Sequence, residues 1–171
     1  MCDLISGRTG KVCKNSLGGN STLYLFQNFV EDPFVYDAGV ATAVNPLLTT
    51  VYEFGLEGDG NTFEQSKASE RANGTSVNTQ TLVAVLKKMD SATHANLQLL
   101  TEQYAQGVVK DRNGNYHAFG IDDGMDFTVL AATGGAKTDL NGYTITGTAT
   151  TRDLCPILDE ATVTAFLALV A

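Results

Sequence analysis

Residues 62–87 read TFEQSKASERANGTSVNTQTLVAVLK, and this stretch decides the fold class. Residues typical of β-strands lie on both sides of Asn73-Gly74, a pair that favours hairpin turns because both residues tolerate a positive φ. We therefore predict a long β-hairpin, with strands at 62–69 and 75–87 and a turn at 70–74. The first strand is quite polar, which makes the hairpin a candidate for packing on a neighbouring molecule.

Upstream of this hairpin, two further strands are predicted. Residues 22–26 (TLYLF) have large side chains on both faces, so both faces are expected to be buried. Between positions 48 and 57, Leu48, Tyr52, Phe54 and Leu56 alternate with polar positions that include Glu53 and Glu57, which indicates one core face and one wet face. The intervening residues 30–46 have no period, and we expect them to form an extended arm.

Downstream of the hairpin, one internal helix is predicted. Asp90 or Ser91 can cap it, and Thr93, Leu97, Leu100 and Tyr104 follow at helical spacing, with Gly107 expected to end it. Three strands at 108–112, 116–121 and 125–131 should then form an antiparallel meander. A last strand at 143–152 has threonine at every second position, and Pro156 precedes an apolar C-terminal helix at 159–170.

Composition excludes several classes of protein. With 171 residues, of which 43% are apolar, the chain can bury one core and should form a single domain, residues 1–171. Charged residues make up only 18% of the chain, which indicates that part of its surface becomes buried in an assembly. The net charge of -8 argues against binding to nucleic acid through its phosphates. No apolar run is long enough for a membrane helix and no signal peptide is recognisable, so we expect synthesis in a cytoplasm.

The sequence contains few residues in patterns that are typical of catalytic or metal-binding sites. His94 and His117 are the two histidines, and no nucleophile or zinc motif accompanies them. Asp111, Asn113 and Asn115 resemble the start of a calcium-binding EF-hand loop, but Tyr116 stands where that loop needs glycine. The group Asp122, Asp123 and Asp126 could hold calcium weakly or form an ordinary acidic turn. The cysteines Cys2, Cys13 and Cys155 lack a CxxC pair and are expected as reduced thiols. We therefore expect no enzyme, no cofactor and no metal.

Several short segments together resemble tail tube proteins of tailed bacteriophages, in particular phages infecting Bacteroidota. They span residues 6 to about 150, and it is their order and spacing, more than any single piece, that makes the resemblance specific. The segments are Ser6-Gly7-Arg8, 13–19 (CKNSLGG), 23–26 (LYLF), Phe63-Glu64, Asn73-Gly74-Thr75, 80–82 (QTL), the internal helix, 111–116 (DRNGNY) with Gly120, and 139–144 (DLNGYT).

This resemblance implies a mainly β fold of two packed antiparallel sheets, a β-sandwich or partial barrel, with one internal helix and a short C-terminal helix. It also implies that six copies form a ring and that the rings stack into a tube. In such a tube, part of a sheet from each subunit forms the wall of an inner barrel through which DNA passes. Partners would be further copies of the chain and other tail and connector proteins, with no membrane. The arm at 30–46 and the helix from Asp159 depart from the plainest pattern and leave open a specialised ring near the capsid or tail tip.

The resemblance and the strand pattern together suggest where such a protein would make contact. The residues expected to face the lumen are Glu53, Glu57, Glu64, Asn78, Gln80, Thr144, Thr146 and Thr148. The residues expected at the contact between rings are Glu70, Arg71, Ala72, Asn73 and Gly74. An acidic or neutral bore would let DNA pass without holding it, because it offers phosphate no cationic partner.

Two other classes of function stay open at this point. The first is a different virion role, as a head-to-tail connector, tail terminator or capsid decoration protein. The second is a carbohydrate-binding β-sandwich. That class usually presents Trp or Tyr platforms, whereas this chain has no Trp and its six Tyr are scattered.

Overall fold

The computed structural model describes residues 6–10 and 13–171, and these residues form two packed β-sheets with two helices. The seven-stranded sheet has the order β2 (Phe34–Asp37), β3 (Val40–Val44), β11 (Ile157–Leu158), β8 (Tyr116–Phe119), β7 (Gly107–Asp111), β1 (Asn20–Phe26), β4 (Val51–Gly55). The four-stranded sheet has the order β5 (Thr62–Glu70), β6 (Thr75–Lys87), β10 (Gly142–Thr151), β9 (Asp126–Ala132). The helices are α1 (Ser91–Leu100) and α2 (Glu160–Leu167).

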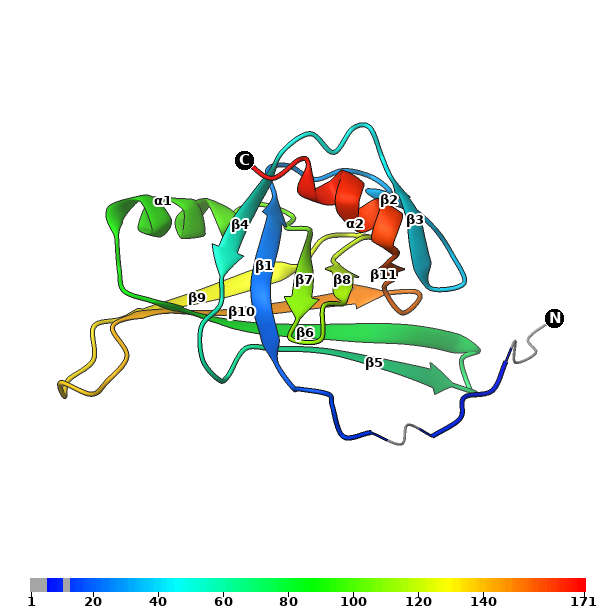
Figure 1. Ribbon diagram of the computed structural model, residues 1–171, viewed down its shortest axis with the longest axis horizontal. Helices are drawn as coiled ribbons and strands as arrows, with labels where there is room; N and C mark the ends of the chain where they lie inside the picture. The colour runs from blue at the N-terminus through cyan, green and yellow to red at the C-terminus, as the bar shows by residue number, and fades with distance from the viewer. Residues whose placement is uncertain (1–5, 11–12) are drawn as a thin grey trace.

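The expected mainly β sandwich is confirmed. All strand pairs are antiparallel except β11 with β3, which run parallel. Figure 1 shows that the strands of the four-stranded sheet follow the long axis of the molecule, whereas those of the seven-stranded sheet run across it. Consequently the open edges of the two sheets point in different directions. These edges are β5 and β9 in the four-stranded sheet and β2 and β4 in the seven-stranded sheet.

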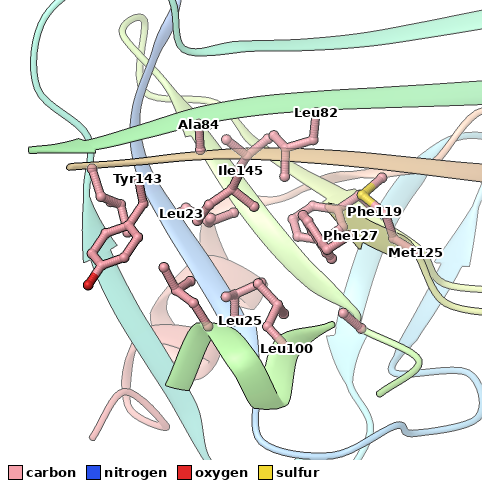
Figure 2. Packing of buried hydrophobic residues seen from close by; sticks show 14 of the residues in the cluster. Leu23, Leu25, Leu82, Ala84, Leu100, Phe119, Met125, Phe127, Tyr143 and Ile145 are labelled. Atoms are coloured by element: carbon pink, nitrogen blue, oxygen red, sulfur yellow. The ribbon is translucent and has the colours of Figure 1, made fainter. Parts of the chain in front are cut away.

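Strand β1 separates two hydrophobic cores, as its sequence predicted. Leu23 and Leu25 face the four-stranded sheet and join the first core, whose residues are drawn in Figure 2. Tyr24 and Phe26 face the other way and pack in the second core, beneath α2. All four side chains are buried because the strand lies between β7 and β4 and is covered on both faces.

The long hairpin is also confirmed. Strands β5 and β6 pair from Thr62↔Val83 to Glu70↔Thr75, and Gly74 has the positive φ of 63° that the turn requires. Strand β10 pairs with β6 only as far as Thr151↔Asn78, so within residues 6–10 and 13–171 the last residues of the hairpin pair with no further strand. Figure 1 shows this end of the hairpin projecting to one side of the molecule.

The expectation of an extended arm at 30–46 was wrong. These residues form a second hairpin, β2–β3, that joins the seven-stranded sheet through β11. Ala38 and Gly39 make its turn with φ of 49° and 84°. The pattern was missed because only Phe34 and Ala41 are buried in these two short strands at the edge of the sheet, so no alternation of apolar residues is visible.

Two further expectations need correction. Helix α1 ends at Leu100, and Gly107 instead begins β7, while Tyr104 lies beyond the helix and is exposed. The strands β7, β8 and β9 are not a meander, because β9 crosses to the other sheet and pairs with β10. Gly124, with φ of 83°, stands in the connection where the chain changes sheets.

The C-terminal helix is confirmed, with bounds close to those predicted. Asp159 caps α2 by accepting a hydrogen bond from the Thr162 backbone N–H at 2.7 Å, and Asp90 caps α1 in the same way through Thr93. Phe166 anchors α2 in the second core with no exposed surface. The helix thus docks on its own chain.

Candidate functional site

The outer face of the four-stranded sheet forms a regular surface of the molecule. Because successive residues of a strand alternate between faces, the register defines which side chains share it. Its central rows consist mainly of threonines and carry Glu64 and Asp126 but no lysine or arginine, whereas Lys87 lies on this face at the end of β6. Its central residues are Thr62, Glu64 and Ser66 of β5, Thr79, Thr81 and Val83 of β6, Thr146, Thr148 and Thr150 of β10, and Asp126 and Thr128 of β9.

Four of the residues expected to face a lumen lie on this outer face. Glu64 and Thr148 share one row across the sheet, in the order Glu64, Thr81, Thr148, Asp126. Thr144 and Thr146 occupy neighbouring rows of β10 and are half-buried, whereas Glu64 and Thr148 are exposed. Thr62, Thr79, Thr81 and Thr128 were missed, although their alternation with apolar or buried positions could have revealed them.

Asn78 and Gln80 were wrongly expected on this face. Both are fully buried, because their positions on β6 point between the sheets. Gln80 accepts a hydrogen bond from the Gly120 N–H at 3.0 Å and donates to the hydroxyl of Thr151 at 3.2 Å and to the sulfur of Cys155. Asn78 donates to Gln65 Oε1 at 3.0 Å and to Thr151 at 2.9 Å. The two amides therefore fasten the segment after β10 to the sheet.

Glu53 and Glu57 also lie away from the outer face. Glu53 is an exposed residue of β4, in the seven-stranded sheet. Glu57 follows that strand and its carboxylate lies 3.7 Å from the Lys87 ammonium. The structure thus does not bring these two carboxylates together with Glu64, and the predicted acidic lining divides between the two sheets.

The predicted contact residues 70–74 form the tip of the projecting hairpin. Glu70, Arg71, Ala72, Asn73 and Gly74 are all exposed, and the Glu70 carboxylate accepts a hydrogen bond from the Ala72 N–H at 3.0 Å. Further back, the Lys67 ammonium lies 2.6 Å from Asp153, which ties the hairpin to the segment after β10. A tip that is held at its base and exposed at its end is suited to contact another molecule.

The four-stranded sheet has two open edges. Among the residues that the structure describes, β5 has no partner strand on one side and β9 has none on the other. Three successive antiparallel pairings separate them, so β5 and β9 run antiparallel to each other. Copies related by rotation alone could therefore join β9 of one to β5 of the next with antiparallel pairing.

The histidines and aspartates considered as candidate site residues in the sequence form hydrogen bonds with nearby turns and strands or lie exposed at the surface. Burial alone would raise the pKa of Asp111, but hydrogen bonds from Asn115, His117 and Asn113 outweigh it, so its pKa lies below the usual value. His117 Nε2 lies 3.2 Å from this carboxylate, and His94 is an exposed residue of α1. Asp122 accepts a hydrogen bond from the Arg152 N–H at 2.9 Å.

Among residues 6–10 and 13–171, no three of His, Cys, Asp and Glu gather as metal ligands would. Cys13 is exposed and Cys155 is buried, both as free thiols, while Cys2 lies outside the described residues. No helix within the described part of the chain has the length and apolar character needed to cross a membrane.

The chain was compared with known proteins at three levels. No protein family, no curated protein and no solved structure matches it. The function is therefore argued from the surfaces described above.

Proposed function

We propose that this chain is a structural protomer of a bacteriophage tail tube, which assembles into hexameric rings and stacks them into a conduit for DNA. The protein would be made in the cytoplasm of the host bacterium and would act in the virion tail. The observation that carries the proposal is the outer face of the four-stranded sheet, whose central rows are rich in hydroxyl groups and carry no basic residue, and which is bounded by two open edges of opposite direction.

The edges support ring closure. Open strand edges promote uncontrolled pairing, and closing a sheet on itself removes them. Joining β9 to β5 around a ring would turn the outer faces of all copies into one continuous wall. Since β5 has nine residues and β9 has seven, the two edges are long enough to form an extended ladder.

The chemistry of the face supports passage of DNA. Threonine hydroxyls keep such a wall hydrated, and the carboxylates of Glu64 and Asp126 give it a negative charge. Phosphate finds no cationic partner there, so the duplex would slide without being held. The projecting tip at 70–74 is then placed to reach a neighbouring ring.

The test is assembly of the purified chain, observed by negative-stain microscopy and light scattering. We expect hexameric rings or open-ended tubes, and a monodisperse monomer at high concentration in moderate salt would refute the proposal. Amide hydrogen exchange then checks the edges: protection should rise in β5 and β9 on assembly and stay unchanged in β1, which is paired with β4 and β7 within the chain. Rings that form without added protection in β5 and β9 would show that other surfaces close them.

A further inference from the structure

A trough lies along the open edge of β5. We call it the β5 trough; its volume is about 430 Å³, and four consecutive residues of the strand, 62–65, line it. On its other side lie Asp111 and His117 of the seven-stranded sheet. Phe63 is half-buried at the rim of the first core, and its ring centroid lies 6.3 Å from that of His117. Because consecutive residues of an edge strand line the trough, an added strand is the shape that fits it.

A smaller cavity lies beside β9, at the opposite edge of the same sheet. We call it the β9 cavity; its volume is about 230 Å³, and it lies between β9 and α1. Val129 and Ala131 of β9 line it, together with Leu97 and Gln98 of α1. Val129 is half-buried and packs against the first core. Each outer strand of the sheet thus has a cavity beside it and a partly exposed apolar side chain of the core.

Phe63 and Val129 point to the same side of the sheet. Phe63 is opposite Leu82 in the pairing of β5 with β6, and Val129 is opposite Ile145 in the pairing of β9 with β10. Leu82 and Ile145 are fully buried between the sheets, so this side is the inner face. If β5 of one copy joins β9 of another, the two side chains meet on that face, and the apolar layer continues across the joint.

The open edges decide which strand fills the β5 trough. Two β5 strands or two β9 strands could pair about a two-fold axis, but each such pairing leaves the other edge of the sheet open. Pairing β5 with β9 uses both edges of every copy. It also joins the two strands whose apolar side chains are left half-buried at the edges of the core. The occupant of the trough is therefore β9 of a second copy.

The alternation of faces restricts the register of this joint. A slip of one residue would turn the apolar side chains of one strand to the wet face, so the possible registers differ by two residues. When Phe63 lies opposite Val129, an aromatic and a β-branched side chain face each other, which stabilises paired strands. On the outer face, Glu64 then lies opposite Thr128. The ladder consists of residues 62–66 of one copy and 126–130 of the next.

The two neighbouring registers are less favourable. A slip of two residues in one direction places Glu64 opposite Asp126, and like charges directly opposite each other destabilise a pair of strands. A slip in the other direction places Phe63 opposite Ala131, which offers less apolar surface than Val129. The register with Phe63 opposite Val129 avoids the repulsion and keeps the larger apolar contact.

The acidic groups along the joint are compatible with this register. Asp126 lies opposite Ser66, so each carboxylate of the ladder has a hydroxyl group as its neighbour. Asp111, on the far side of the trough, lies 3.2 Å from His117 and accepts hydrogen bonds from two backbone N–H groups of its own turn. It therefore needs no partner from the second copy.

We propose that β5 of one copy pairs antiparallel with β9 of the next copy, with Phe63 opposite Val129 and Glu64 opposite Thr128. This inference rests on the proposed ring and names the residues that determine how its subunits recognise one another. Met125 already forms a bridge with Ala105, so the edge of β9 is open only from residue 126 onward. The hairpin beyond residue 66 consequently stays outside the joint, where its tip can reach another ring.

Disulfide cross-linking measures the register directly. In a chain with Cys2→Ser and Cys13→Ser, we combine Glu64→Cys with one second cysteine, introduced as Asp126→Cys, Thr128→Cys or Leu130→Cys. Burial raises the pKa of Cys155 to about 11, so that thiol stays unreactive. Opposite residues of antiparallel strands have Cα atoms about 4.5–5.5 Å apart, which suits a disulfide, whereas diagonal neighbours lie about 7–8 Å apart.

The pair at positions 64 and 128 should give the highest yield, as a ladder of covalent oligomers that ends at six subunits. Three strand spacings, about 14 Å, separate β5 from β9 within one copy, so no disulfide forms inside the chain. A higher yield with Asp126→Cys or Leu130→Cys would overturn the register. Dimers formed by Glu64→Cys alone would show that two β5 strands pair, and would overturn the proposal as well.

A charge exchange uses assembly as the measurement. Thr128→Glu places a carboxylate opposite Glu64 and should raise the concentration needed for ring formation, by up to about fivefold per contact. Adding Glu64→Lys to Thr128→Glu should restore assembly, because opposite charges then face each other. Thr79→Glu is the matched control, since Thr79 is exposed on the same face but lies in β6, away from the joint. Equal weakening by the control, or no restoration in the double variant, would contradict the contact.

The outcomes separate this inference from the proposed function. If the unmodified chain forms tubes but cross-linking is strongest at another pair of positions, the tube stands and this register fails. If the unmodified chain stays monomeric, the proposed function fails, and with it the joint that this inference describes.

Discussion

Tyr24 of β1 and Phe166 of α2 meet edge to face, with ring centroids 5.4 Å apart and an interplanar angle of 84°. Phe166 also lies within 6.2 Å of Phe26 and 6.1 Å of Phe34, measured between ring centroids. Three strand residues thus surround one helix residue, and this cluster fixes α2 over the seven-stranded sheet.

Replacing Phe166 should therefore destabilise the whole fold. We expect Phe166→Ala to lower the free energy of unfolding by about 3–5 kcal/mol, because it leaves a cavity in the second core. Urea denaturation followed by circular dichroism measures the change. Leu167→Ala, on the exposed side of the same helix, should cost much less, and a loss of equal size would show that the aromatic cluster does not dominate the contribution of α2.

The buried amide of Gln80 gives a second stability prediction. Gln80→Met keeps the volume but leaves the buried N–H of Gly120 without its acceptor, so unfolding free energy should fall by about 1–3 kcal/mol. Thr79→Met, one residue away on the outer face, is the control and should change little. Equal stability of the two variants would contradict the role assigned to the buried network.

The Asp111 carboxylate should make stability depend on pH. Its pKa is lowered in the folded state, so it contributes stability above pH of about 4 that is lost as pH falls below that value. Asp111→Asn should be less stable than the unmodified chain at pH 7, and the difference should narrow at pH of about 3. Denaturation at both pH values measures this, and a difference independent of pH would exclude the carboxylate charge as its cause.

Deleting residues 70–74 tests the hairpin tip. If the tip joins successive rings, the shortened chain should still form rings, because β5 and β9 keep their open edges, but the rings should not stack. Replacement of the tip by an equally long Gly-Ser sequence is the control for loss of side chains without loss of length. Tubes of normal length after the deletion would show that the contact lies elsewhere.

A change of charge on the outer face tests the proposed lumen. We expect Thr148→Lys to assemble normally and to make tubes retain DNA at low salt, with release at high salt, because lysines exchange counterions with phosphate. Co-sedimentation with short duplex DNA measures retention. Thr42→Lys, an exposed position of β3, is the control; retention by both variants alike would place residue 148 outside a lumen.

Much of the fold follows from local pattern. The hairpin of β5 and β6, both faces of β1 and the N-terminal cap of α1 at Asp90 or Ser91 were predicted because each depends on neighbouring residues along the chain. The hairpin β2–β3 was not, since short strands at a sheet edge bury too few residues to show a period. The crossing of β9 to the second sheet depends on contacts far away in sequence.

The sequence by itself determined which residues turn and which alternate, because backbone preference and side-chain spacing are local properties. Only the tertiary structure decided which side of each strand meets solvent. Asn78 and Gln80 have the polarity of exposed residues, yet they are buried, where the Asn78 NH2 group bonds to Gln65 and Thr151 and the Gln80 amide to Gly120 and Thr151. The Asn78 Oδ1 atom has no partner among the described residues. Such partners are brought together by packing, which no local pattern specifies.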